Sequence, residues 1–165
     1  MQDLRIQKIV VHMGVGESGE KLAKAEEVLS TITEQKPVKA MAKKTQPAFG
    51  TRKGSPIGCK VTLRGDAAES FFATSFGIVE RQIAASQFDS QGNFSFGIEE
   101  HTDFPGMSYD PSIGIFGMDI NVVLEKRGAR IARRKVVTKK LPEKQRVKRE
   151  EAIRFLQEKY RAEVR

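Results

Sequence analysis

Four segments of this sequence alternate apolar and polar side chains, and this alternation limits the possible folds more than any other feature. A strand with one apolar and one polar face lies in a sheet that is covered on one side only, which is typical of antiparallel sheets. The alternating segments are residues 4–13, 59–64, 94–98 and 118–124. Apolar residues elsewhere recur every three or four positions, which predicts helices. The predicted helices are residues 20–35, 66–83 and 150–161.

Strands and helices that are mixed unevenly along the chain predict an α+β fold, with a largely antiparallel sheet and helices packed on one face. A further short strand is expected at 38–42. Residues 43–56 are rich in glycine, proline and basic residues and should form a long, mobile loop. The length of 165 residues suits one domain, and there is no internal repeat. We therefore expect a single domain over residues 1–165.

Basic residues are concentrated in two stretches. Residues 36–64 hold eight Lys and Arg and no acid, and residues 126–149 hold twelve Lys and Arg with the single acid Glu143. The rest of the chain is acidic, although the whole protein carries a net charge of +8. Like charges so close in sequence repel one another, and binding to phosphates would relieve that repulsion. The charge pattern therefore favours a nucleic acid as the partner. The second stretch has little hydrophobic periodicity, so we expect a basic segment that is extended or loop-like until it meets a protein or RNA surface.

The polar faces of the predicted strands carry part of this charge. Lys8 and His12 lie on the polar face of the first strand, and Lys60, Thr62 and Arg64 lie on the polar face of the strand at 59–64. If the helices cover one side of the sheet, the other side is an open platform with positive charge and hydrogen-bonding groups. Such a platform fits a folded RNA, whose shallow minor groove exposes base edges and 2′-hydroxyls.

Motifs that would indicate an enzyme have little support. Residues 14–19 match the GxGxxG turn of dinucleotide-binding proteins, but the preceding strand carries charged residues and Glu17 would face a pyrophosphate. Cys59 lies on the apolar face of its strand, where we expect a buried and unreactive thiol. One cysteine and two histidines do not make a zinc site, and no apolar run is long enough to span a membrane. We expect no cofactor, no metal and no membrane partner. The alternative is a small enzyme that binds a nicotinamide or flavin dinucleotide at the glycine turn.

Several segments resemble one protein family. They are VVHMGVGESGEKL, TEQKP, PIGCKVTLRG, FDSQGNFSFGI and YDPSIGIFGMDINVVL, and the similarity covers nearly the whole chain. The sequence resembles the universal large-subunit ribosomal protein family L-five, in its archaeal and eukaryotic branch. The resemblance implies a non-enzymatic structural constituent of the cytoplasmic large ribosomal subunit. It also implies an α+β domain that binds 5S rRNA in the central protuberance.

The resemblance also implies roles for individual residues. The family binds 5S rRNA through its sheet; Gln35 and Thr62 match two of its contacts, and His12 stands where the family has Asn. Glu34 replaces the Gly that usually precedes the Gln. Together with the charge pattern and the strand faces, these matches give the predicted rRNA-binding residues. They are Lys8, His12, Gln35, Lys36, Lys60, Thr62, Arg64, Arg130, Arg133, Arg134 and Lys135.

Further partners are implied by the same resemblance. The family's loop at 43–56 reaches the elbow of the peptidyl-site tRNA, which makes Phe49, Arg52 and Lys53 the tRNA-binding candidates. Residues 81–88 resemble the part that forms an intersubunit bridge to a small-subunit head protein. The charge of residues 126–149 predicts contact with large-subunit rRNA, and binding of an acidic protein is the alternative for this stretch.

Overall fold

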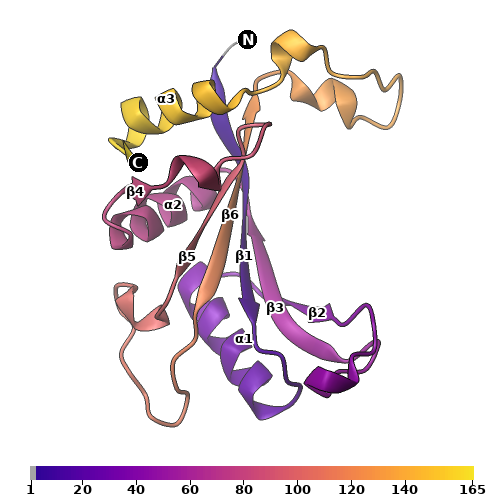
Figure 1. The fold of residues 1–165 in the computed structure, drawn as a ribbon, viewed down its shortest axis with the longest axis vertical. Coiled ribbons are helices and arrows are strands. Elements are labelled where there is room, and N and C mark those ends of the chain that lie inside the picture. Colours follow the sequence, from indigo (N-terminus) through magenta and orange to yellow (C-terminus); the bar gives the residue numbers. More distant parts are fainter. Residues whose placement is uncertain (1–2) are drawn as a thin grey trace. The chain divides into compact units, whose positions relative to one another are not determined.

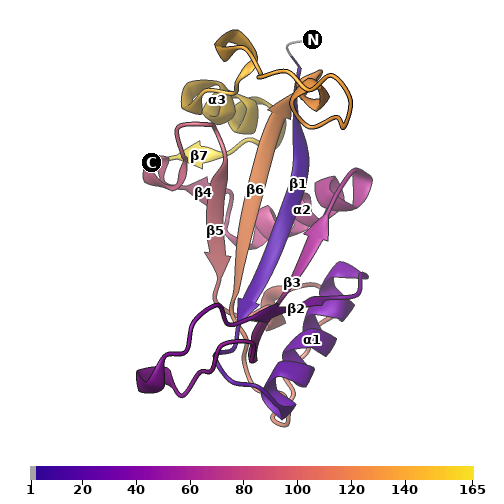
Figure 2. The same ribbon diagram turned by 90° about the vertical axis from the view of Figure 1, so that its right-hand side faces the viewer.

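The computed structural model describes residues 3–165 (Figures 1 and 2). Within these residues it has three α-helices and seven strands. The strands are β1 (Leu4–Gly14), β2 (Val38–Met41), β3 (Pro56–Leu63), β4 (Gln82–Ile83), β5 (Phe94–Ile98), β6 (Met118–Lys126) and β7 (Glu163–Val164). The helices are α1 (Glu20–Thr33), α2 (Asp66–Ile78) and α3 (Arg149–Tyr160). No helix in this part of the chain is long and apolar enough to cross a bilayer.

Five strands form one mostly antiparallel sheet in the order β2-β3-β1-β6-β5. In the antiparallel β2–β3 pair, Val38 lies opposite Lys60 and Ala40 lies opposite Gly58. β4 and β7 form a separate two-stranded parallel sheet. The predicted α+β fold with a largely antiparallel sheet is confirmed. The dinucleotide alternative does not fit this topology. A dinucleotide-binding fold needs the strands before and after the first helix, here β1 and β2, to be parallel neighbours. In this sheet β3 lies between β1 and β2.

The contacts of the chain divide it into two compact units. Unit 1 comprises the described residues up to Ile9 together with Arg64–Phe96 and Asn121–Arg165. Unit 2 comprises Val10–Leu63 and Gly97–Ile120. β1 and β6 contribute residues to both units. The single domain expected over residues 1–165 stays a prediction.

In unit 2, α1 packs against β3 (Figure 1). The helix buries Leu22, Ala25 and Leu29, and the strand buries Cys59 and Val61. This alternation in β3 matches the predicted apolar face. Cys59 has no exposed surface, and burial, with a smaller contribution from the nearby Glu26 carboxylate, raises the pKa of its thiol to about 11. A thiol with such a pKa is almost entirely protonated at neutral pH, so the structure agrees with an unreactive cysteine.

In unit 1, α2 and α3 lie on one side of the strands (Figure 2). Phe72 of α2 is the centre of an aromatic core. Its ring centroid lies 5.0 Å from that of Phe76, 5.8 Å from that of Phe94 and 4.7 Å from that of Tyr160. The last two pairs meet edge to face, the geometry that the aromatic quadrupole favours. Phe72 and Phe76, four residues apart in α2, are therefore both buried on its inward face.

Both of the first two helices end earlier than the periodicity predicts. α1 ends at Thr33 because Glu34 adopts a left-handed conformation with φ 52°. α2 ends at Ile78 rather than Ile83, since Glu80 and Arg81 have φ 53° and 60°, which a right-handed helix cannot accommodate. Ile83 is still buried, but as a residue of β4 that pairs with Val164. Apolar spacing continues past the end of α2, so periodicity alone could not locate this boundary.

Candidate nucleic-acid interface

The polar face of β3 in unit 2 is uncovered. Lys60 and Thr62 are exposed and alternate with the buried side chains that pack under α1. His12, on the polar face of β1, is half-buried, with 39% of its side chain exposed. The expected open platform is therefore present in this unit, and it offers an ammonium, a hydroxyl and an imidazole. A hydroxyl and a neutral imidazole can each donate and accept a hydrogen bond.

His12 lies where β3 has no side chain. A Cβ atom at Gly58 would be 2.7 Å from the carbonyl oxygen of Met13 and 3.4 Å from Nε2 of His12. Glycine therefore allows β3 to approach β1 closely at this point. Nδ1 of His12 is 3.9 Å from the Asp119 carboxylate of β6, close enough to attract the ring when it is protonated. Asp119 is absent from the predicted set, although the alternation of β6 places it on the polar face.

Gln35 and Lys36 are exposed in the connection between α1 and β2. The left-handed conformation of Glu34 turns the chain out of the helix at this point. Glycine adopts this conformation most easily, which gives a physical reason for the Gly that the family places there. Because Val38 lies opposite Lys60, Gln35 and Lys36 are at the end of the β2–β3 ladder where Thr62 lies.

The loop between β2 and β3 projects from these strands (Figure 2). It comprises residues 42–55, because β3 begins at Pro56. Its tip is a short 3-10 turn, Pro47–Phe49, closed by a bridge between Gln46 and Thr51. Phe49 is 78% exposed, and Arg52 and Lys53 are exposed beside it. An aromatic ring next to two cations is a surface on which a base can stack.

Ion pairs attach the basic stretch 126–149 to other parts of unit 1. Glu125 is buried, and its two carboxylate oxygens pair with Arg5, at 2.6 Å, and with Arg133. The buried Lys126 pairs with Glu151 of α3 at 2.7 Å, which lowers the pKa of that carboxyl group. Arg127 also lies 3.9 Å from the Asp3 carboxylate, so three of the twelve basic residues have an acidic partner within the protein.

The structure agrees with the loop-like form predicted for this stretch rather than with the extended one. Between β6 and α3 the chain is irregular, but it contains two 3-10 turns, Ala129–Ala132 and Glu143–Gln145. We call residues 129–148 the basic extension. Arg130, Arg134 and Lys135 of the extension are exposed. The ion pairs of the flanking carboxylates, which periodicity does not reveal, hold the extension against the strands.

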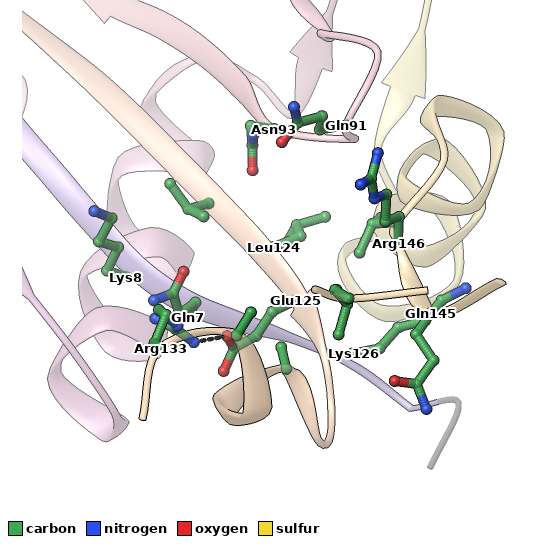
Figure 3. A pocket seen from close by; sticks show the side chains of 15 residues that line it. Gln7, Lys8, Gln91, Asn93, Leu124, Glu125, Lys126, Arg133, Gln145 and Arg146 are labelled. Carbon is green, nitrogen blue, oxygen red and sulfur yellow. Dashed lines mark hydrogen bonds and ion pairs between the residues drawn. The ribbon is translucent and has the colours of Figure 1, made fainter. Parts of the chain in front are cut away.

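The extension closes a pocket of about 390 Å³ over β1 and β6 (Figure 3). We call it the extension pocket. Alternation in β1 breaks here: Ile6 and Ile9 are both buried, and the two residues between them, Gln7 and Lys8, both line the pocket. In unit 1 the polar face of the sheet is therefore partly covered by the extension. The polar lining of the pocket includes Gln7, Lys8, Gln91, Asn93, Gln145 and Arg146.

A neighbouring hollow of about 490 Å³ brings together arginines from distant parts of the chain. Arg64, which follows β3, lines it together with Arg5 and Arg130, and Arg133 lines both this hollow and the extension pocket.

The structure thus gathers the predicted residues in separate places. Unit 2 holds His12, Gln35, Lys36, Lys60 and Thr62 together with the loop residues Phe49, Arg52 and Lys53. Unit 1 holds Lys8, Arg64, Arg130, Arg133, Arg134 and Lys135. Gln91, Gln145 and Arg146 are absent from the predicted set, because an isolated amide in a turn or a single arginine in a basic run has no distinctive spacing. No cluster of acidic, histidine or cysteine side chains among residues 3–165 could hold a metal ion.

Known proteins match this chain along almost its whole length. Residues 1–52 match a family model described as ribosomal protein L5, and residues 56–155 match the model of the C-terminus of the same ribosomal protein family. The large ribosomal subunit protein uL5 of Methanoregula boonei is 69% identical over 165 residues, which is 100% of each chain. That of Methanoculleus marisnigri is 67% identical over 164 residues, covering 99% of this chain and 98% of the relative. That of Methanospirillum hungatei is 59% identical over 163 residues, covering 99% and 97%.

Proposed function

Because this chain belongs to the ribosomal protein L5 family, in its archaeal branch, and is a structural, non-enzymatic constituent of the large ribosomal subunit, we propose that it binds 5S rRNA through the open sheet face of unit 2. Family membership places it in the cytoplasmic ribosome as an rRNA-binding protein of translation. The observation that carries the proposal is the uncovered face of β3, where Lys60 and Thr62 are exposed and Gly58 of the same strand lies beside His12.

The chemistry of this face suits a folded RNA. Lys60 presents an exposed ammonium that can contact a phosphate, and the Thr62 hydroxyl can exchange hydrogen bonds with a 2′-hydroxyl or a base edge. Gln35 and Lys36 extend the surface beyond the end of the β2–β3 ladder. Phosphate contacts supply affinity, whereas the hydroxyl and amide groups supply orientation.

Substitutions at Lys60 and Thr62 should have different signatures. Lys60→Gln is expected to weaken 5S rRNA binding and to reduce the dependence of log affinity on log salt by about 0.7–0.9, the effect of one lost phosphate contact. Thr62→Val is expected to weaken binding by about 1–2 kcal/mol without changing the salt dependence, because it removes an uncharged hydrogen-bonding group. Filter binding of archaeal 5S rRNA across a salt series measures both effects.

Lys21→Gln is a matched control for Lys60→Gln, since Lys21 is an exposed lysine of unit 2 on α1 and forms an ion pair with Glu17 at 3.2 Å. It should leave the affinity unchanged. Equal losses for the two lysine variants, or equal wild-type affinity for 5S rRNA and an unrelated duplex of the same length, would contradict the proposed surface.

We further propose that the loop of residues 42–55 contacts the peptidyl-site tRNA. The exposed Phe49 ring with Arg52 and Lys53 supports this contact. Phe49→Ala should speed release of peptidyl-site tRNA from reconstituted ribosomes by about tenfold or more, as expected for loss of a stacked aromatic ring. Tyr109→Ala removes another exposed aromatic ring of unit 2 and serves as the control. Equal tRNA release from both variants and the wild type would exclude a role for Phe49.

Two other contacts complete the proposal. The exposed Arg130, Arg134 and Lys135 of the basic extension are suited to large-subunit rRNA. Residues 81–88 are proposed to form the bridge to a small-subunit head protein, on the basis of the family resemblance. A photoreactive group at Ser86, which is exposed, should crosslink to a small-subunit protein in assembled ribosomes, and failure to do so would count against the bridge.

A further inference from the structure

We propose that the extension pocket takes one unstacked nucleobase of the rRNA, an inference that rests on the proposed function and specifies how unit 1 recognises RNA. The pocket is formed entirely by unit 1, from β1, the turn at residues 89–93, β6 and the basic extension (Figure 3). Its volume of about 390 Å³ lies within the ~300–1,000 Å³ typical of pockets that hold small molecules. Proteins recognise unpaired RNA bases that are turned away from their neighbours, by hydrogen bonds to the base edge and by stacking on the base face.

The apolar part of the lining can cover the face of a base. Val123 and Leu124 of β6 line the pocket, as do Ala129, Ala132 and Leu141 of the extension. Because the side chains of Ala129 and Ala132 are small, they leave part of the pocket beside β6 unfilled. A flat aromatic base is a suitable occupant of a cavity between a strand and a short turn.

The polar part of the lining can read the edge of a base. The side-chain amides of Gln91 and Gln145 line the pocket, and neither makes a hydrogen bond within the described part of the chain. Asn93 donates its amide to Asp89 at 2.8 Å, which leaves its carbonyl oxygen as an acceptor. Amide side chains pair with the donors and acceptors of base edges, above all with those of adenine.

The charges of the pocket favour a nucleotide over a side chain from a neighbouring protein. Glu125 is neutralised by its two arginines and Lys126 by Glu151. Lys8 and Arg146 have no ion-pair partner among residues 3–165 and line the pocket from opposite sides (Figure 3). They can contact the phosphates that flank an inserted base, and the planar guanidinium can also stack on the base. An apolar protein side chain would leave both cations and both amides unpaired.

Filling the pocket without changing its charge tests the inference. Ala132→Leu puts a larger side chain into the pocket from its exposed rim, and Ala129→Leu does so from the same turn. Ala67→Leu, on the exposed surface of α2, is the matched control. Each full-length variant is bound to archaeal 5S rRNA and to large-subunit rRNA. Dimethyl sulfate then reports protection of base edges, and hydroxyl radicals report protection of the RNA backbone.

The wild type and Ala67→Leu are expected to protect the base of one unpaired nucleotide. In Ala132→Leu and Ala129→Leu that base should react as in free RNA, with the affinity lowered about tenfold or more and the hydroxyl-radical footprint of unit 2 retained. Circular dichroism and thermal melting show whether each variant is folded. One folded variant of the two is enough to test the inference. Continued protection of the base in a folded, filled variant overturns the inference.

Other outcomes separate this inference from the proposed function. A backbone footprint without any protected base in the wild type overturns the nucleobase pocket and leaves 5S rRNA binding standing. A second outcome is that the filled variants still protect the base but are lost from subunits assembled with the other ribosomal proteins. This outcome overturns the nucleobase pocket and indicates that a protein side chain occupies it. The absence of any wild-type footprint on either RNA contradicts both proposals.

Discussion

Glu125→Ala is expected to release the basic extension and to lower the free energy of unfolding by about 2–3 kcal/mol. Only 9% of the Glu125 side chain is exposed, and its carboxylate oxygens pair with Arg5 and Arg133. Alanine at this position leaves two guanidinium groups close together without an anion. Loss of one partner of a fully buried ion pair costs about 3–5 kcal/mol. The cost should be lower here because both arginines are about half exposed and water can solvate them.

Urea denaturation measures the change in stability, and hydrogen exchange of residues 129–148 measures release of the extension. In the wild type the amide of Arg134 donates to the carbonyl of Arg130 at 3.0 Å, and this amide should exchange faster in the variant. Glu17→Ala is the matched control, since Glu17 forms an ion pair with Lys21 in which both side chains are about two thirds exposed. Its effect should be below about 0.5 kcal/mol. Similar losses in the two variants would show that Glu125 does not anchor the extension.

Gly92→Ala is expected to lower the free energy of unfolding by about 2–5 kcal/mol, because it combines backbone strain with overpacking. Gly92 has φ 72°, in the left-handed region, and an added Cβ would lie 2.6 Å from Cγ1 of Val147 and 3.1 Å from Cβ of Ala152. Val147 and Ala152 are both buried, so neither can move aside cheaply. The substitution should therefore displace the start of α3 from the turn at residues 89–93.

Thermal unfolding measures this loss, and Gly77→Ala is the matched control. Gly77 lies in α2, and a Cβ there would meet nothing within 4 Å. Alanine has a higher helix propensity than glycine, so the stability of this variant should be unchanged or raised by up to about 1 kcal/mol. A Gly92→Ala protein that melts at the same temperature as the Gly77→Ala protein would contradict the packing argument.

The same turn explains part of the FDSQGN segment that carries the family resemblance. Asp89 accepts hydrogen bonds from the backbone amides of Gln91 and Asn93, each at 2.8 Å, and from the side-chain amide of Asn93. The carboxylate thus satisfies three donors of a tight turn, while Gly92 supplies the left-handed conformation and the space under α3. In PIGCKVTLRG, Gly58 has a different role, because its missing side chain lets β3 approach Met13 and His12 of β1 closely.

Local patterns predicted most of the fold. Alternation correctly placed Cys59, Val61 and Leu63 in the core and Lys60 and Thr62 on the surface. Helical spacing correctly identified three helices, since burial of one apolar face is what makes each of them form. The ends of α1 and α2 were missed because they depend on the left-handed residues Glu34 and Arg81. The pairing of β4 with β7 was also missed, as each is two residues long.

The candidate interface was predictable to the extent that it follows from one strand. Lys60, Thr62 and His12 are placed on the polar face by a period of two, whatever their partners are. The extension pocket was not predictable, because Lys8, Gln91 and Arg146 come from three distant segments. A break in the alternation of β1 also turns Gln7 to the same side as Lys8.

The sequence by itself determined which side chains could be buried and where positive charge would accumulate, because periodicity and charge are properties of neighbours along the chain. The tertiary structure alone decided that the buried Glu125 would hold Arg5 and Arg133 and bend the basic extension over the sheet. Such a contact depends on which residues the fold brings together. The residues that neighbour Glu125 in the sequence do not distinguish it from the other acids or indicate its partners.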